Sequence, residues 1–348
     1  MKIALDAGPL SDGNAGRGIG VYTQLLYDAL KVQEEVLVEA IDVHSTKNFE
    51  SYDLVHYPSF DFFQNTLQIP QNIPVVVTIH DTIPLIYPKN YPPGIRGTIA
   101  LYKQKQALKK VSAVITDSLT SKKDIIRYLN VKPERIFPIY LGPTISKITK
   151  NDSQKSVLRK FQISYPYVLY IGDVNWNKNL LSLCRACDQI GAHLVIVGKR
   201  AVSKDYDKNH IENRPLVEMQ KIAKTSSFIH TIGFVDDEDL PSIVKGAQLL
   251  CQPSYYEGFG FSVLDAMSLG IPTVCAKTQA LSEIYGSATV FFNPSDVADM
   301  ASVIESVLAN ETLQRKLQKL GLTLSKSFSW NKTASETVNV YKNVLAQK

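Results

Sequence analysis

The sequence predicts an α/β protein with two domains, each built on a parallel sheet. Short β-branched runs alternate with amphipathic stretches along the whole chain, the pattern of parallel strands covered by helices. The chain has 348 residues, enough for about two domains. A polar, lysine-rich stretch without periodicity, residues 143–165, separates the two halves and is interpreted as a linker.

Twelve strands are expected, six in each half. In the first half they are at 2–7, 36–43, 53–56, 75–80, 113–116 and 135–139, and in the second at 167–171, 193–197, 229–232, 249–252, 273–276 and 289–291. The helices between them are expected at 20–31, 97–111, 121–130, 180–190, 240–245, 260–270 and 295–310. Thr120 or Ser121, with Asp124, resembles a capping start for the helix at 121–130.

A final helix at 331–346 follows Phe328-Ser329-Trp330 and is expected to cross back to the first domain. The predicted organisation is therefore a first domain over 1–150, a second over 151–328 and a closing segment over 329–348.

The composition is that of a folded globular protein, with 45% hydrophobic and 20% charged residues, which excludes disorder and low-complexity classes. The N-terminal apolar run is too short for a signal peptide, and no segment has the ~20 apolar residues of a membrane span. We therefore expect a cytoplasmic protein with reduced thiols. Cys184 and Cys187 form a C-x-x-C inside a predicted helix, where core packing is favoured over zinc or redox chemistry.

Two glycine-containing turns lie between a strand and a helix, where backbone N–H groups can approach a phosphate. The first contains Gly16, Arg17 and Gly18. As a dinucleotide fingerprint it lacks the third glycine, since Val21 stands there, and it lies far beyond its strand. A nicotinamide dehydrogenase is therefore disfavoured, while a flexible loop over the sheet edge remains an alternative.

The second turn is more specific, because it places two carboxylates near one helix N-terminus. Glu257 precedes the turn Gly258-Phe259-Gly260-Phe261, whose N–H groups could hold a ligand, and Asp265 follows eight positions later on nearly the same helix face. Two carboxylates at this spacing can bind two groups of hydroxyls of one polar ligand. The alternative makes Glu257 a charge at the helix N-terminus and Asp265 a solvated side chain.

These residues resemble the signature of the retaining glycosyltransferases of family four, a Glu in an E-G-F-G turn with a second acid eight positions later. The likeness covers nearly the whole chain, and further segments stand in the family's order: Gly18-Ile19-Gly20-Val21-Tyr22, His80-Asp81-Thr82-Ile83-Pro84, Thr116-Asp117-Ser118, Tyr170-Ile171-Gly172, Lys178-Asn179 and Gly233-Phe234-Val235. The resemblance implies the GT-B fold, with two Rossmann-like domains facing a central cleft, the acceptor on the first and a nucleotide sugar on the second.

The resemblance also implies roles for single residues. Glu257, with the backbone of Gly258, Phe259 and Gly260, would hold the hydroxyls of the donor sugar, and Asp265 those of the ribose. Lys178 would neutralise the diphosphate, which the Gly16–Gly20 loop approaches from the first domain. The remaining implied positions are His80 beside the reacting face of the sugar and Val235 at the base pocket.

Two positions depart from the family. Asp265 replaces the usual Glu, and Asp173 stands where many members have an Arg that pairs with the lysine. Either Arg17 or Arg200 supplies the second cation for the leaving diphosphate, or Asp173 only caps its turn and Lys178 suffices.

The implied activity is a retaining transfer of a hexosyl-type sugar, of the mannosyltransferase kind, by a front-face mechanism in polysaccharide biosynthesis. The resemblance implies that no metal is needed, which the absence of a convincing D-x-D triplet fits, and no cofactor beyond the nucleotide-diphosphate sugar is expected. The alternatives are an inactive sugar-nucleotide-binding module and another GT-B enzyme, either an epimerase or a phosphorylase.

The acceptor half carries a concentration of positive charge. Residues 96–135 contain ten Lys or Arg against three acidic residues, whereas the whole chain has a formal net charge of +5. This charge favours a glycan or lipid-linked acceptor and peripheral contact with an anionic membrane at its cytoplasmic face, with a merely solvated surface as the alternative. Nucleic acid is not expected, because no recognition module is present.

Overall fold

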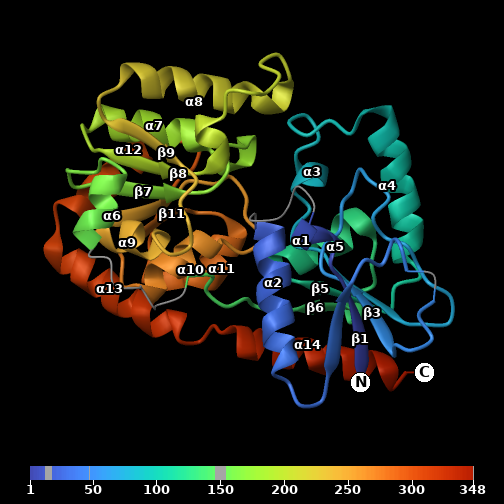
Figure 1. The fold of residues 1–348 in the computed structure, drawn as a ribbon. Coiled ribbons are helices and arrows are strands. Elements are labelled where there is room, and N and C mark those ends of the chain that lie inside the picture. The colour runs from blue at the N-terminus through green and yellow to red at the C-terminus, as the bar shows by residue number, and fades with distance from the viewer. Residues whose placement is uncertain (12–17, 47, 146–153, 348) are drawn as a thin grey trace. The chain divides into compact units, whose positions relative to one another are not determined.

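The computed structural model describes residues 1–11, 18–46, 48–145 and 154–347. They form two compact units, Met1–Thr144 with Phe328–Lys348, and Ile145–Ser327 (Figure 1). The boundaries predicted from the sequence lie after residues 150 and 328.

The first unit contains a six-stranded parallel sheet in the order β2-β1-β3-β4-β5-β6. Its strands are β1 (Lys2–Asp6), β2 (Leu37–Ile41), β3 (Leu54–Tyr57), β4 (Val75–Thr78), β5 (Ala113–Thr116) and β6 (Ile136–Pro138). Its α-helices are α1 (Gly8–Ser11), α2 (Gly18–Lys31), α3 (Ile83–Ile86), α4 (Gly94–Leu108), α5 (Leu119–Leu129) and α14 (Trp330–Leu345). Strands β3, β4 and β5 are buried along their whole length, as expected for apolar runs covered on both faces.

Helix α14 belongs to the first unit although it ends the chain. It packs against α2, the Trp330 indole donates to the Pro143 carbonyl at 2.9 Å, and the Thr333 hydroxyl donates to the Tyr140 carbonyl at 2.8 Å. A side chain at Gly142 would lie 2.6 Å from the Trp330 nitrogen, so this contact requires glycine.

The second unit contains another six-stranded parallel sheet, in the order β12-β11-β10-β7-β8-β9. Its strands are β7 (Val168–Ile171), β8 (Leu194–Val197), β9 (Ile229–Gly233), β10 (Leu249–Gln252), β11 (Thr273–Ala276) and β12 (Val290–Phe292). Its α-helices are α6 (Gln154–Lys160), α7 (Leu180–Gln189), α8 (Arg214–Thr225), α9 (Leu240–Gly246), α10 (Phe261–Ser268), α11 (Gln279–Tyr285), α12 (Val297–Leu308) and α13 (Glu311–Ser325).

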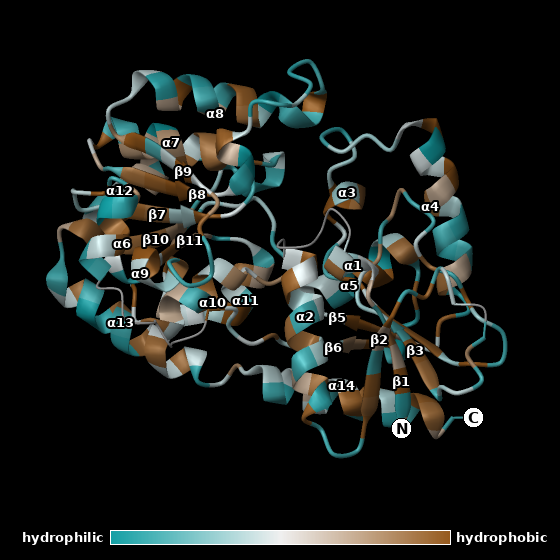
Figure 2. Cartoon of the chain, viewed as in Figure 1, coloured by the Kyte–Doolittle hydropathy of each residue, from teal (hydrophilic) through white to brown (hydrophobic). Residues whose placement is uncertain are grey.

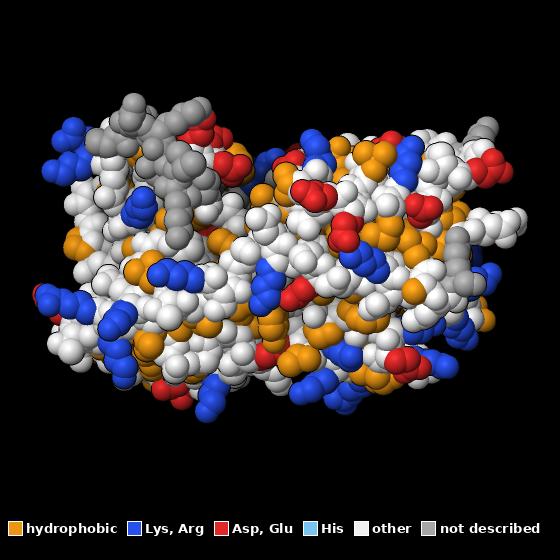
Figure 3. Space-filling model, turned by 90° about the horizontal axis from the view of Figure 1, so that it is seen from below, with side chains coloured by type: hydrophobic (Ala, Val, Ile, Leu, Met, Phe, Trp, Pro, Cys, Tyr) orange, Lys and Arg blue, Asp and Glu red, His pale blue; other side chains and the backbone are white. Residues whose placement is uncertain are grey.

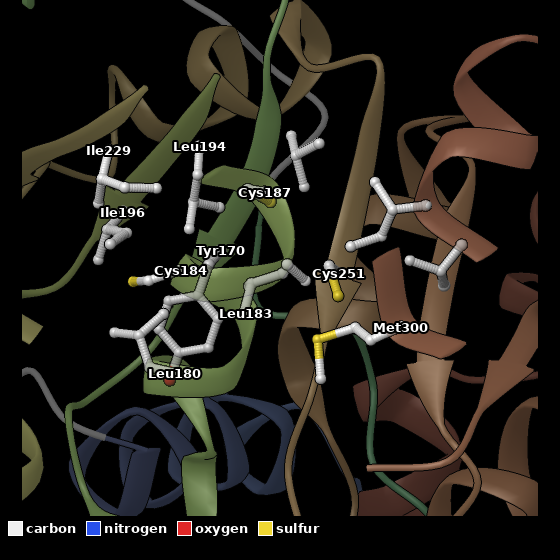
Figure 4. Close-up of a cluster of buried hydrophobic side chains, with 14 of the residues drawn as sticks. Tyr170, Leu180, Leu183, Cys184, Cys187, Leu194, Ile196, Ile229, Cys251 and Met300 are labelled. Carbon is white, nitrogen blue, oxygen red and sulfur yellow. The ribbon is translucent and has the colours of Figure 1, made fainter. Parts of the chain in front are cut away.

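The core of the second unit explains its cysteines. Cys184 and Cys187 on α7 point into a buried cluster with Tyr170, Cys251 and Met300 (Figure 4). Burial raises the pKa of the Cys184 thiol to about 12. The packing interpretation of the C-x-x-C is therefore confirmed.

The α/β prediction is confirmed, with all twelve expected strands present, three with the predicted bounds and the others with at least one end shifted by one or two residues. Two local expectations are wrong. The proposed linker contains α6, and α5 is capped by Ser118, whose hydroxyl accepts from the Ser121 N–H at 3.0 Å, so neither Thr120 nor Ser121 is the cap. The extended backbone of Ser118 puts its oxygen within reach of the first turn.

Charges of both signs are interspersed on the face seen in Figure 3, in keeping with a small net charge. Among the helices within the described ranges, none combines the length and apolarity that a bilayer span needs.

Candidate active site

The carboxyl end of β10 leads into a tight turn that opens α10. Gly260, the residue before α10, has a φ of +93°, and a Cβ there would lie 2.8 Å from the Leu281 side chain. The Tyr285 hydroxyl donates to the Gly260 carbonyl at 2.8 Å. Because an L side chain is strained in this conformation, glycine is required at the point where the helix begins.

The same turn holds Glu257 as a buried carboxylate, 7% exposed. The Lys178 ammonium donates to its two oxygens at 2.8 and 2.9 Å. The Gln252 amide and the Ser254 hydroxyl donate to Oε1 at 2.8 and 2.6 Å. The Ser262 hydroxyl donates to the Gln252 carbonyl oxygen at 2.6 Å and so fixes which end of that amide faces Glu257. Glu257 is therefore a buried carboxylate held by three side chains, beyond its position as a charge near the helix N-terminus.

Lys178 ends a short 3-10 segment, Trp176–Lys178, after β7. The Asn179 amide next to it donates to the carbonyls of Pro253 and Pro294 at 3.1 and 2.8 Å. The Tyr255 N–H donates to the Asn177 carbonyl at 2.8 Å. These bonds fasten the loop that carries the lysine to the loop that carries the glutamate.

Asp265 is also buried, 4% exposed, so its interpretation as a solvated side chain is wrong. Its Oδ1 accepts the Ile145 N–H at 3.1 Å. Tyr170, at the end of β7, has a pKa raised well above its usual value, first by burial and then by the charge of Glu257. Its neutral hydroxyl donates to the carbonyl of Asp173 at 2.7 Å.

The other candidates of the second unit lie at the ends of neighbouring strands. Arg200, after β8, donates to the Asn175 amide oxygen at 3.2 Å and to that of Asn213 at 2.5 Å, which holds it beside the segment that carries Lys178. Val235 is buried just beyond β9. The remaining residues of the α10 turn are a buried Gly258, a buried Phe259 and a half-buried Phe261.

In the first unit, Gly18 is exposed at the start of α2, whereas Gly16 and Arg17 lie outside the described residues. His80 follows β4 and packs edge-on against Tyr22, with 4.5 Å between the ring centroids. Its Nδ1 is 2.8 Å from an Asp117 oxygen and its Nε2 is 3.1 Å from the Pro58 carbonyl. Since both partners only accept, this geometry requires a proton on each ring nitrogen.

The charges around His80 favour that doubly protonated ring. Burial alone would lower its pKa, but the charge and hydrogen bond of Asp117 outweigh it, and the pKa is raised. Nearby His56, bonded to Thr78 and Tyr341, is kept neutral, because burial and then the charge of His80 lower its pKa to about 3. His80 therefore presents N–H donors and no lone pair.

Two buried polar atoms near His80 lack a hydrogen-bond partner within the described structure: Asp117 Oδ1 and Thr82 Oγ1. Unpaired buried polar atoms are rare in native proteins, and a polar ligand is one way to satisfy them. Among the residues that can be described, no three or more His, Cys, Asp or Glu side chains are grouped to hold a metal ion.

Sequence reasoning did not identify Gln252, Ser254 or Asn177. Gln252 and Ser254 lie five and three positions before Glu257, the carboxylate to which they donate, whereas the partners of Asn177 lie on the loop after β10.

Two family models match the chain, the Glycosyltransferase Family 4 model over residues 38–145 and the Glycosyl transferases group 1 model over residues 154–322. O-antigen chain mannosyltransferase B of Escherichia coli is 27% identical over 89% of this chain and 81% of its own length. The serotype-specific mannosyltransferase WbdA of Escherichia coli is 27% identical over 80% of this chain, which spans 35% of that longer protein.

Solved structures share the fold. Sucrose-phosphate synthase of Thermosynechococcus elongatus has a TM-score of 0.74 at 19% identity, with full coverage of both chains. Anabaena HepE in complex with UDP-glucose has a TM-score of 0.68 at 16% identity, covering 100% of this chain and 99% of its own. With both family models and the fold in agreement, the chain belongs to the family-four glycosyltransferases of GT-B fold.

Proposed function

We propose that this glycosyltransferase moves a hexosyl sugar, of the kind mannosyltransferases transfer, from a nucleotide-diphosphate donor to a hydroxyl of a glycan or lipid-linked acceptor, with retention of configuration. The observation that carries the proposal is the ion pair between the partly buried Lys178 and the buried Glu257 at the start of α10. The relatives named above as mannosyltransferases, and the neighbour solved with UDP-glucose, support the sugar class and the kind of donor.

The Lys178–Glu257 pair suits a nucleotide-sugar donor because the two side chains can separate without leaving either charge unpaired. When a diphosphate enters, the Lys178 ammonium turns to the phosphate oxygens. Glu257 keeps the donors from Gln252 and Ser254 and gains hydroxyl donors from the sugar. The Asp265 carboxylate can only accept hydrogen bonds, and it accepts them from the ribose hydroxyls. Val235 lines the pocket for the base.

Departure of the nucleoside diphosphate leaves negative charge on its oxygens, where a fixed cation lowers the barrier. Lys178 supplies one cation. Arg200 is a candidate for the second, since its two amide partners fix it near the lysine segment without neutralising it. Arg17 is the other candidate, and the alternative that Lys178 suffices remains open.

On the acceptor side, the protonated His80 does not accept the proton of the attacking hydroxyl, and its Nε2–H exchanges the Pro58 carbonyl for a sugar oxygen when the substrate binds. In the front-face mechanism that proton passes to an oxygen of the leaving diphosphate, so neither a metal ion nor a protein base is needed. The unpaired atoms of Asp117 and Thr82 offer contacts to a polyhydroxyl ligand. A cytoplasmic location, at the inner face of the membrane, would bring the enzyme to a lipid-linked acceptor.

The test is turnover of a panel of GDP-, UDP-, ADP- and dTDP-sugars with mannosyl oligosaccharides and lipid-linked acceptors. We expect release of nucleoside diphosphate with one mannosyl or related hexosyl donor, unaffected by EDTA. The one-bond carbon–proton coupling constant at the anomeric carbon should show that the product keeps the anomeric configuration of the donor. Inversion would refute the retaining mechanism, and donor binding without turnover on any acceptor would favour the binding-module alternative.

A further inference from the structure

Helix α4 has apolar side chains on two opposite faces. Its inner face, made of Gly97, Ala100, Gln104 and Leu108, is buried in the first unit. Its outer face carries large hydrophobic side chains that the described part of the chain leaves exposed: Ile95 is 83% exposed, Ile99 53% and Tyr102 66%. Figure 2 shows hydrophobic and hydrophilic residues alternating along this helix.

The three outer side chains form one row. Their spacing of four and then three residues brings them within an arc of roughly 60° over a length of about 10 Å. The centre of that arc lies opposite the buried residues. Single exposed hydrophobic residues are ordinary on a protein surface, but a contiguous row marks a binding surface.

Positive charge borders this row. Arg96 and Lys103 lie along one side of it and Lys105 along the other, while Lys109 and Lys110 follow the helix. The sequence has no Asp or Glu from residue 82 to residue 116, so no carboxylate within this segment offsets these charges.

Two other cations of residues 96–135 are bonded to backbone carbonyls of the first unit. The Lys122 ammonium donates to the Ile136 carbonyl at 2.8 Å, and Arg135 donates to the carbonyls of Leu108 and Lys109. Of the remaining eight cations, five lie on or just beyond α4, whereas Lys123, Arg127 and Lys132 lie in a segment that also contains Asp124 and Glu134.

We propose that the outer face of α4 docks on an anionic lipid surface, with Ile95, Ile99 and Tyr102 entering the headgroup level and the flanking cations contacting lipid phosphates. Tyrosine suits this boundary because its ring is apolar and its hydroxyl polar. A second copy of the chain fits this face poorly, because a two-fold contact would bring the two cationic borders together. The inference deepens the proposed function, in which the acceptor is lipid-linked.

The first experiment measures partition of the full-length protein onto vesicles of phosphatidylcholine with and without phosphatidylglycerol. We expect binding to the anionic vesicles that weakens with salt. Replacing the outer row by Ile95→Ser, Ile99→Ser and Tyr102→Ser should lower the partition coefficient on the order of 100-fold. Arg96→Gln with Lys103→Gln should lower it roughly tenfold at low salt. Val32→Ser, at a hydrophobic position that is similarly exposed (69%), is the matched control and should leave the partition coefficient unchanged.

The second experiment reports on the face itself. The four native cysteines are buried, so a maleimide fluorophore will label an introduced thiol selectively. We expect the emission of a label at Tyr102→Cys to shift to the blue on anionic vesicles, and that of a label at Val32→Cys to stay unchanged.

The outcomes separate the docking from the catalytic proposal. Wild-type partition by the triple serine variant, or an unshifted label at position 102, overturns docking through α4. A shift that depends on protein concentration without vesicles also overturns it, in favour of self-association. Turnover with a soluble acceptor should be unchanged in the triple variant, whose melting temperature checks its fold. Vesicle binding by a protein that never turns over a donor would refute the proposed function and leave the docking intact.

Discussion

Replacing Lys178 with methionine separates its part in the fold from its proposed part in catalysis. The variant leaves Glu257 buried, with only the neutral donors of Gln252 and Ser254. Removing one partner of a fully buried ion pair costs about 3–5 kcal/mol. The Lys178 side chain is 24% exposed and two donors remain, so we expect a loss of about 2 kcal/mol in the free energy of unfolding.

The same variant should lower kcat by about 10²–10³-fold, because a preorganised charge at the leaving group is lost. Adding Glu257→Gln removes the stranded charge. The double variant should therefore be more stable than Lys178→Met alone, by about 1 kcal/mol, yet no more active. Urea unfolding and single-turnover kinetics on the four proteins of this cycle give both quantities.

The two readouts together make the cycle decisive. If kcat recovers along with stability in the double variant, Lys178 acts only through the fold. If the two substitutions are additive in stability, the pair seen between Lys178 and Glu257 carries no energetic coupling. Either result contradicts the reasoning. Lys277→Met, which changes an exposed lysine of the same unit, is the control.

Four further predictions follow from single residues. Gly260→Ala should cost about 1–3 kcal/mol, because the alanine must adopt a φ of +93° against a neighbour 2.8 Å away, and urea unfolding will measure this loss. Asp265→Asn should raise the KM for the donor roughly tenfold with little change in melting temperature, since the amide oxygen can still accept the backbone N–H that the carboxylate accepts. The free energy of unfolding should fall by about 2 kcal/mol between pH 6.5 and 5, because His56 is protonated in the unfolded chain over this range but stays neutral in the native protein, where its pKa is about 3. If the His56→Gln variant loses stability with pH as steeply as the wild type, His56 is not the cause. His80 should have the opposite effect, because its pKa is raised in the folded protein. It stabilises the fold fully below its pKa in the unfolded chain, and this contribution is lost as the pH rises through its folded pKa. The His80→Gln variant should therefore lose less stability than the wild type as the pH is raised through that range.

The strands were predictable because a buried parallel strand requires a short β-branched run, as in β4 or β5. Helix α6 was not. It has seven residues, only Val157 among them is buried, and its amphipathic signal is lost among lysines. The cap of α5 was misplaced by two or three residues, since several hydroxyl side chains stand in succession and only the backbone angles decide which one faces the first turn.

The site was predictable only where its residues act through a local motif. Glycine at position 260 follows from its turn, but the pairing of Lys178 with Glu257, 79 residues later, follows from the sheet. Strands β7 and β10 lie side by side although β8 and β9 come between them in the chain. Because parallel strands end at one edge of a sheet, the segment after β7 meets the turn after β10 there, which brings Lys178 to Glu257 and Asn177 to Tyr255 and Tyr256. Gln252 and Ser254 instead donate to Glu257 from within the same segment. A substitution that shifts β10 by one residue against β7 would therefore separate the ion pair even if both charged residues were kept.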